Sequence, residues 1–236
     1  MSANTSSILK TNLKLDVGPA QPRVDATFTS PQSLPEKVVV FVFGHGIMND
    51  KDHPLLAAPL DLLAENGFCG LRFNFPFKQK GGETVDERVV LMETISSAIG
   101  WVRTRLEGHE VIVIIGGKSL SARMAAAYQA EKKDADGLVY LGYPLHRPES
   151  TERLRDSDLY KIQVPQLFIT GEKDPYCRGD LLQKVLDKIA SPKNNIVIPD
   201  GDHGLGISHS GDDSKSLDII KKVADETGKW TRSHYV

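Results

Sequence analysis

The amino-acid sequence predicts an α/β fold, in which helices cover both faces of a mostly parallel sheet. Apolar runs of strand length alternate with helical patterns along the 236 residues, and several of these runs are apolar at every position. Strands that are buried on both faces are typical of parallel sheets, and helices of ten or more residues between them form βαβ units. We expect a single domain over residues 1–236, with about the first 12 residues disordered.

The strands are predicted from short runs rich in β-branched and aromatic residues, most of which end at Gly or Pro. Six such runs are residues 38–43, 69–75, 111–115, 137–141, 166–170 and 195–198. Two earlier segments, 13–17 and 24–29, are expected to add an antiparallel edge to the sheet. Apolar residues recur at helical spacing between the runs. The expected helices cover residues 54–65, 87–106, 119–131, 179–189 and 214–227.

The composition argues against several classes of partner. Lys and Arg number 29 against 31 Asp and Glu, so the net charge of −2 lacks the basic excess of a surface for nucleic acid or anionic lipid. No apolar run approaches the roughly 18 residues that span a bilayer, and the polar first 16 residues lack the hydrophobic core of a signal peptide. Two cysteines, Cys69 and Cys177, are too few for a disulfide scaffold. We expect a cytoplasmic protein with free thiols and with no nucleic-acid or membrane partner.

The most informative stretch is VIVIIGGKSLSARM at residues 111–124, which runs from a buried strand through a tight turn into an alanine-rich helix. Such a strand–turn–helix holds an exposed nucleophile, here Ser119, over the carboxyl end of a sheet. The sharp turn requires small residues two positions before and after it, and these are Gly117 and Ser121. The N–H of Leu120, at the helix N-terminus, is then one expected oxyanion donor.

A serine hydroxyl needs a base and an orienting acid to become a nucleophile. Asp174 follows the run 166–170, and His203 follows the run 195–198. Because each of the three residues comes just after its own strand, we expect them to meet at one edge of the sheet, where open α/β sheets bind ligands. The sequence therefore predicts a catalytic triad of Ser119, His203 and Asp174.

Each member of this triad has a structural alternative. Ser119 could cap the helix that follows it, Asp174 could serve a turn before proline, and His203 could be a surface-loop histidine. The rival acids are Asp200 and Asp202, and the rival base is His209.

The glycine-containing turn at residues 44–49, after the first buried run, is expected to supply a second oxyanion donor. We assign this role to the N–H of Ile47, with Gly46 as the alternative, and expect His45 to be structural. No metal-type spacing or dinucleotide fingerprint occurs, so neither a metal nor a cofactor is expected. Four neighbouring polar residues have side chains of the kind that bind metals: Asn49, Asp50, Asp52 and His53. We expect them instead to stabilise the turn and cap the helix that begins at Pro54.

Aromatic residues in the loops after strands are expected to wall an apolar acyl or alcohol pocket. The residues chosen for substrate binding are Phe77, Tyr143 and Tyr176. The interval from Pro144 to Pro165, where a lid is often inserted, holds only about twenty residues. This length leaves no room for a large cap domain, and an open site favours small esters. Two roles remain open for Arg72, Lys118 and Arg123. Each could bind an acidic group of the substrate, or it could pair with a structural carboxylate.

Six segments carry a resemblance to a known family. They are GHGIMNDKDHP (44–54), LRFNFPF (71–77), GGKSLSARMA (116–125), LGYPLHRPES (141–150), LFITGEKDP (167–175) and DHGL (202–205). In these segments the chain resembles the α/β-hydrolase superfamily and, within it, the small cap-less group similar to dienelactone hydrolases. The nearest likeness is to the testis-expressed-protein-thirty and NSL-complex-subunit-three-like branch. The resemblance implies an α/β-hydrolase fold and the Ser119, Asp174, His203 triad, although the usual GGKSMGGR is altered at residues 120–122 and serine replaces the cysteine of true dienelactone hydrolases.

The sequence thus predicts a serine hydrolase, most specifically a carboxylesterase that cleaves small esters through an acyl-enzyme on Ser119. Its expected partner is a small-molecule ester, and a homodimer is left open. One alternative is a non-catalytic scaffold that binds a protein partner, as chromatin-complex relatives suggest. The other is thioesterase, lactonase or amidase chemistry, which the same triad supports.

Overall fold

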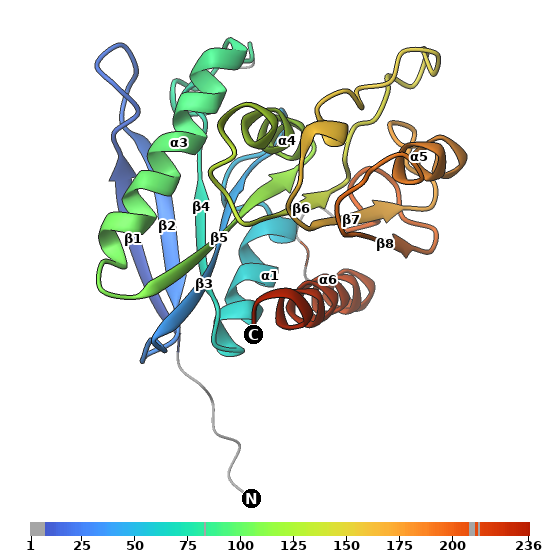
Figure 1. Ribbon diagram of the computed structural model, residues 1–236. Helices are drawn as coiled ribbons and strands as arrows, with labels where there is room; N and C mark the ends of the chain where they lie inside the picture. The colour runs from blue at the N-terminus through green and yellow to red at the C-terminus, as the bar shows by residue number, and fades with distance from the viewer. Residues whose placement is uncertain (1–7, 83, 208–210, 212) are drawn as a thin grey trace, which may run out of the picture.

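The computed structural model describes residues 8–82, 84–207, 211 and 213–236 and shows an eight-stranded sheet with helices on both faces (Figure 1). The strands are β1 (Leu9–Leu15), β2 (Val24–Ser30), β3 (Lys37–Gly44), β4 (Cys69–Phe73), β5 (Glu110–Lys118), β6 (Gly137–Leu141), β7 (Gln166–Gly171) and β8 (Lys193–Ile198). Their spatial order is β1-β2-β4-β3-β5-β6-β7-β8. β1 and β2 form an antiparallel edge, and the strands from β4 to β8 pair in parallel. The predicted fold class and antiparallel edge are confirmed.

The central strand β3 shows why both faces of the sheet need cover. Its residues 38, 40 and 42 lie in one hydrophobic core, and residues 39, 41 and 43 lie in a second core on the other face. Since successive side chains of a strand point to opposite faces, a strand without polar residues has to be buried on both sides.

The helices divide between these two cores. α3 (Arg88–Arg105), α4 (Leu120–Lys132) and α5 (Gly179–Leu186) contribute to the first core. α1 (Pro54–Glu65) and α6 (Ser214–Tyr235) contribute to the second core and pack against each other. The interval between β6 and β7 holds loop and one short 3₁₀ turn, η1 (Leu159–Lys161), and no cap domain. None of the helices in the described residues is long and apolar enough to cross a membrane.

Several boundaries differ from the predicted ones, among them those of β1, β4 and α6. β1 begins at Leu9 and pairs with β2, so residues 9–12 are ordered; residues 1–7 lie outside the described part of the chain. β4 ends at Phe73, because the chain turns at Phe75 into the short helix α2 (Pro76–Gln79). α6 continues beyond residue 227 to its end at Tyr235, because the side chains at 230 and 231 are buried and extend its apolar face.

The parallel strands bring four loops to one edge of the sheet. β3, β5, β7 and β8 all run in the same direction, so their carboxyl ends lie together. The turn after Gly44, the residue Ser119, and the loops that hold Asp174 and His203 follow these strands in that order. This edge is where ligands of open α/β sheets bind.

Candidate active site

The backbone at Ser119 adopts a conformation that is rare for residues with a β-carbon. Ser119 has φ 53° and ψ −105° at the junction of β5 and α4. Two glycines permit this turn: a β-carbon on Gly116 would meet the Val139 carbonyl. A β-carbon on Gly117, which has φ 117°, would meet the Gly44 backbone. The strained turn holds the Ser119 side chain over the carboxyl end of the sheet, as predicted.

Side chains from three loops form a hydrogen-bonded series at this edge. The Ser119 hydroxyl lies 2.8 Å from His203 Nε2. On the other side of the ring, His203 Nδ1 lies 2.8 Å from Asp174 Oδ2 and 3.0 Å from Oδ1. Because an ionised carboxylate only accepts hydrogen bonds, Nδ1 carries the proton and Nε2 accepts from the hydroxyl. The Asp174 side chain is fully buried and also accepts from the Tyr176 N–H at 2.8 Å, so its orientation is held from two directions.

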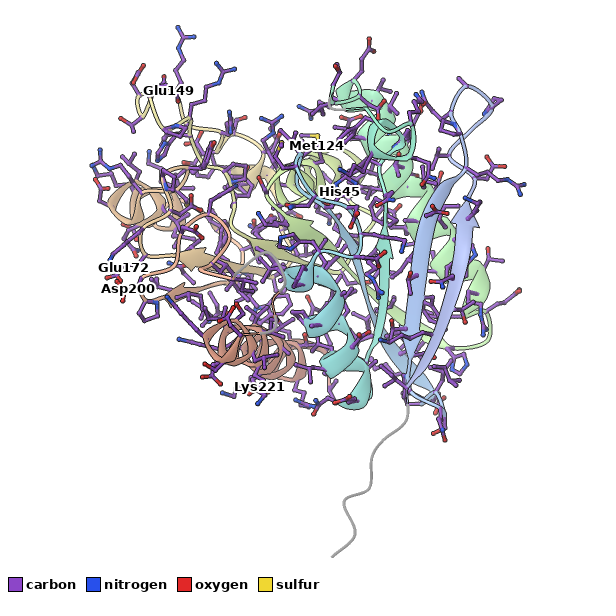
Figure 2. The ribbon with its side chains drawn as sticks, turned by 180° about the vertical axis from the view of Figure 1, so that it is seen from behind. His45, Met124, Glu149, Glu172, Asp200 and Lys221 are labelled. Atoms are coloured by element: carbon purple, nitrogen blue, oxygen red, sulfur yellow. The ribbon has the colours of Figure 1, made fainter. Side chains whose placement is uncertain are left out.

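The rival acids are engaged elsewhere. Asp200 pairs with a surface lysine, and its N–H donates to Glu172 Oε2 at 2.9 Å. Figure 2 shows Glu172 and Asp200 close together at the outer edge of the molecule. Asp202 Oδ1 accepts from two backbone N–H groups of its own turn. The rival base, His209, lies outside the described residues.

His45 fixes the peptide that carries the second expected oxyanion donor. It is fully buried, and Figure 2 shows it inside the molecule. Its Nε2 accepts from the Phe75 N–H at 3.0 Å, so its Nδ1 carries the proton and donates to the Gly46 carbonyl at 2.7 Å. The Asn49 N–H donates to the same carbonyl at 3.2 Å. Since C=O and N–H point in opposite directions across a trans peptide, these two bonds turn the Ile47 N–H away from the loop interior.

The two assigned oxyanion donors border the same pocket as the serine. Leu120 opens α4, where backbone N–H groups have no intrahelical acceptor. Ile47 lines the pocket together with Ser119 and His203. Gly46, the alternative donor, also lines it, and a β-carbon there would lie 3.4 Å from Ser119 Cβ. Backbone N–H groups on two sides of a nucleophile suit a carbonyl oxygen that becomes negative.

A family model described as an alpha/beta hydrolase domain matches residues 37–232. The chain belongs to the alpha/beta hydrolase family. Its structure is similar to a dienelactone hydrolase from Anabaena variabilis, at 18% identity over 96% of this chain and 98% of that chain, with a TM-score of 0.74. It is also similar to Est1E from Butyrivibrio proteoclasticus with bound ferulic acid, at 13% identity over 94% and 98% of the two chains, with a TM-score of 0.75.

A third similar structure is a serine hydrolase without a lid from Xanthomonas campestris, at 17% identity over 94% of each chain, with a TM-score of 0.70. At these identities the likenesses show the fold alone. The family and the fold support hydrolase activity in general terms.

The pocket of this alpha/beta hydrolase lies in front of Ser119 and has a volume of about 410 Å³. Its lining residues are Gly46, Ile47, Met48, Asn49, Lys118, Ser119, Leu120, Arg123, Pro144, Arg155, Tyr176 and His203. Tyr176 is one of the aromatic residues predicted for substrate binding, and its ring centroid lies 4.5 Å from that of His203.

The prediction for the other two aromatic residues is corrected by the structure, because Phe77 and Tyr143 are buried and do not line the pocket. Phe77 packs against His45, with ring centroids 5.5 Å apart. Tyr143 packs edge-on against core aromatic rings, and its hydroxyl donates to the Arg155 carbonyl at 2.6 Å. Both residues follow strands, as expected, but α2 directs Phe77, and the loop after β6 directs Tyr143, towards the first core rather than towards the pocket.

The structure separates the cations that the sequence left ambiguous. Arg72 is structural, because its Nε donates to Asp52 at 3.2 Å and its Nη1 lies 3.9 Å from Asp61. Lys118 and Arg123 line the pocket, and so does Arg155, which sequence reasoning missed. The segment that holds Arg155 has neither a motif nor a periodic apolar pattern, so nothing local marks that residue as part of a site.

Of the four polar residues that resemble metal ligands, His53 and Asp50 have the predicted cap and turn roles, whereas the Asp52 carboxylate pairs with Lys51 and Arg72 and Asn49 lines the pocket. His53 Nδ1 accepts from the Leu55 N–H at 3.2 Å at the start of α1, and Asp50 Oδ1 accepts from the Asp52 N–H at 2.9 Å. Within the described ranges, no group of three or more His, Cys, Asp or Glu side chains could hold a metal ion.

Proposed function

We propose that this chain is a serine hydrolase that cleaves small carboxylic esters through an acyl-enzyme on Ser119. The observation that carries the proposal is the continuous hydrogen-bonded series from Ser119 through His203 to Asp174 beside an open pocket. A hydroxyl 2.8 Å from an imidazole, whose other nitrogen donates to a buried carboxylate, is arranged for proton removal as the oxygen attacks a carbonyl.

The reaction proceeds in two steps. Ser119 Oγ attacks the ester carbonyl carbon while His203 Nε2 takes the hydroxyl proton, and Asp174 stabilises the imidazolium that forms. The tetrahedral intermediate expels the alcohol, which receives that proton from His203. A water molecule, deprotonated by His203, then attacks the acyl-enzyme and releases the carboxylic acid and Ser119.

The carbonyl oxygen becomes negative in both steps and needs donors that are already in place. The N–H groups of Leu120 and Ile47 serve this purpose at the pocket wall. A single donor of this kind contributes about 100- to 1,000-fold to the rate. His45 contributes indirectly, because its hydrogen bond to the Gly46 carbonyl holds the Gly46–Ile47 peptide in its orientation.

The pocket supports small substrates. Its volume of about 410 Å³ suits a short acyl or alcohol group, and no cap domain extends it. Tyr176, whose ring is tilted against that of His203, provides an aromatic wall. The same groups could act on thioester, lactone or amide carbonyls, so these acyl donors belong in the substrate panel.

The proposal extends to subfamily and location. We assign the chain to the testis-expressed-protein-thirty and NSL-complex-subunit-three-like branch because of the six segments that resemble it. We assign it to the cytoplasm because Cys69 and Cys177 are both free thiols, which are typical of a reducing compartment.

The experiment that tests the proposal measures hydrolysis of p-nitrophenyl acetate, butyrate and octanoate by wild type, Ser119→Ala and Ser33→Ala. Ser33 is an exposed serine between β2 and β3, at the opposite end of the strands, and serves as the matched control. We expect kcat to fall by at least about 10,000-fold in Ser119→Ala only. A fluorophosphonate probe should label wild type and the control but not Ser119→Ala.

Equal rates in wild type and Ser119→Ala on every ester and thioester would overturn the proposal. A protein partner that binds stoichiometrically, in the absence of any Ser119-dependent turnover, would then favour the scaffold interpretation.

A further inference from the structure

The pocket in front of Ser119 carries positive charge that no neighbouring carboxylate neutralises. Arg123 and Arg155 both line it, and neither forms an ion pair within the described part of the chain. Elsewhere in the fold, acid partners within 4 Å are found for several arginines, among them Arg72, Arg88, Arg103 and Arg178. Exposed arginines such as Arg105 and Arg147 also lack an ion pair among the described residues, but Arg123 and Arg155 are the ones that border the pocket of Ser119.

We propose that the substrate of this hydrolase is an ester that carries an anionic group, a carboxylate or a phosphate, which Arg123 and Arg155 bind. The inference rests on the proposed function and names its substrate class. The anionic group takes no part in the bond changes: the ester bond to the alcohol breaks, water supplies the new carboxylate oxygen, and the charge near the arginines stays as it was.

Arg155 is held in place by the backbone around it. Its N–H donates to the Leu145 carbonyl at 2.7 Å, and its own carbonyl accepts from the Tyr143 hydroxyl at 2.6 Å. Its Nη1 donates to the Pro144 carbonyl at 3.2 Å. These bonds fold the loop after β6 back onto its own beginning, beside the pocket. A guanidinium has five N–H donors, so this anchoring leaves most of them free to bind a ligand.

Arg123 reaches the pocket from a different element, the helix α4. It lies in the first turn of α4, where its N–H donates to the Ser119 carbonyl at 3.1 Å. A rigid helix thus fixes its position relative to the nucleophile. Its half-buried side chain has no hydrogen-bond partner among the described residues, although it borders the pocket.

The charged groups around the pocket do not neutralise the positive charge of Arg123 and Arg155. Burial lowers the pKa of Arg155, and the positive charges of Arg123 and the exposed Arg147 lower it further, which shows that the three cations lie near one another. Three acids of the same loop have other partners: Glu152 accepts from the Ser150 hydroxyl at 2.8 Å, Asp156 accepts from the Tyr160 hydroxyl at 2.8 Å, and Asp158 faces Arg88 and Lys161.

Lys118 also lines the pocket but has a different electrostatic setting. Burial lowers its pKa, and the negative charges of Asp174 and Asp202 oppose that shift. These two acids offset its charge, so we leave Lys118 out of the proposed anion site. An anion between Arg123 and Arg155 would instead relieve their mutual repulsion, and the planar guanidinium fork matches both carboxylate and phosphate oxygens.

The test compares esters that differ only in charge. One pair places the charge on the acyl part: 4-nitrophenyl hydrogen glutarate and its methyl-capped ester. The other pair places it on the alcohol part: 4-acetoxybenzoate and its methyl ester. Wild type, Arg123→Gln, Arg155→Gln and Arg105→Gln are assayed at one ionic strength, because salt screens such attractions. Arg105 is an exposed arginine at the C-terminal end of α3, away from the pocket, and is the matched control.

We expect wild type and Arg105→Gln to have a higher kcat/KM for the charged member of at least one pair. Arg123→Gln and Arg155→Gln should each lower that preference by about 10- to 100-fold, the value of a charge-assisted hydrogen bond. Inorganic phosphate and glutarate are then compared as inhibitors of the neutral ester in wild type. The stronger inhibitor identifies the anion, and this arm needs no variant to fold.

Three results would overturn the inference: no preference for charge in either pair, a preference that survives both substitutions, or inhibition by neither anion. Failure of the proposed function looks different, because wild type would then hydrolyse no neutral ester in a Ser119-dependent manner. Neutral esters cleaved through Ser119, with charged ones no faster, would refute the substrate class alone.

Discussion

At the scale of single residues, the site depends on side chains held in unfavourable states. Ser119 stores backbone strain, with φ 53° on a residue that has a β-carbon. His45 stays neutral inside the protein, because burial lowers its pKa to about 4. Strain and burial of this kind usually cost stability, and they persist where the surrounding structure holds them. Each cost can be measured separately.

Replacing the serine should separate its strain from its chemistry. Ser119→Ala keeps a β-carbon at positive φ, whereas Ser119→Gly removes it, so the glycine variant should be more stable by about 1 kcal/mol. For a chain of this size that difference corresponds to roughly 2–4 °C in Tm, measured by thermal unfolding of both inactive variants. The same pair of substitutions at Ser33, which has no positive φ, should show the opposite order. Equal Tm values for the two Ser119 variants would argue against stored strain.

Burial of His45 should make stability depend on pH in a defined range. The unfolded chain takes up a proton near the ordinary pKa of 6.5, whereas the native imidazole resists protonation down to about pH 4. The unfolded state therefore binds more protons between these values, and stability falls as pH is lowered through that range. We expect this one group to account for a loss of roughly 2–3 kcal/mol between pH 7 and 4.5.

Urea unfolding of wild type and His45→Gln at both pH values measures this contribution. The variant should lose less stability on acidification, since its amide does not titrate. A pH dependence identical to that of wild type would contradict the assignment.

At the scale of elements, one hydroxyl links β3, which precedes the turn at residues 44–49, to β5, which precedes Ser119. Ser121, fully buried in α4, accepts from the Gly44 N–H at 3.1 Å and donates to the Gly116 carbonyl at 2.7 Å. Gly44 ends β3 and Gly116 lies near the end of β5. The position matches a place where the resembled family usually has glycine. Gly44 accommodates the larger residue, because a β-carbon there would lie 2.5 Å from Ser121 Oγ.

Removing this hydroxyl should affect both stability and rate. Ser121→Ala leaves a buried N–H and a buried carbonyl without their partner, which costs about 1–3 kcal/mol of unfolding free energy. Because Gly44 leads into the turn with Ile47, we also expect a lower kcat with little change in KM. Chemical denaturation and steady-state kinetics on p-nitrophenyl butyrate measure the two effects, with Ser33→Ala as the reference. A variant with the stability and kcat of wild type would show that the link is dispensable.

At the scale of the whole molecule, two hydrophobic cores on either side of one sheet support an open edge. The loop between β6 and β7, which would hold a lid, instead folds back and is anchored at Arg155. Figure 2 shows Glu149 in the same loop at the periphery of the molecule. The site therefore faces solvent without a cover that has to move.

An uncovered site should respond smoothly to substrate concentration. With no lid to displace, turnover of p-nitrophenyl butyrate should show no jump when the substrate exceeds its solubility and forms droplets. The pocket of about 410 Å³ should also favour butyrate over octanoate. Rates measured across the solubility limit, with and without detergent, check both expectations. A sharp activation at the interface would indicate a moving cover.

The sequence alone was sufficient for the sheet and for the meeting of Ser119, His203 and Asp174. Parallel strands in βαβ order bring their carboxyl ends to one edge whatever the details of packing. A tight turn also needs glycines at fixed positions, so the strand–turn–helix around Ser119 is visible in local sequence. The role of His45 inside its loop followed from the same local reasoning.

Only the tertiary structure decided which side chains face the pocket. Phe77 and Tyr143 follow strands just as Tyr176 does, yet they pack inward, while Arg155 reaches the site from a segment without any pattern. The direction of a loop side chain depends on contacts between segments far apart in sequence, such as the hydrogen bond from Tyr143 to the Arg155 carbonyl. Periodicity cannot report such contacts, because loops have no repeat that links residue spacing to a face. The turn that holds Ser119 was therefore visible in local sequence, whereas the charge of its pocket arose from tertiary packing.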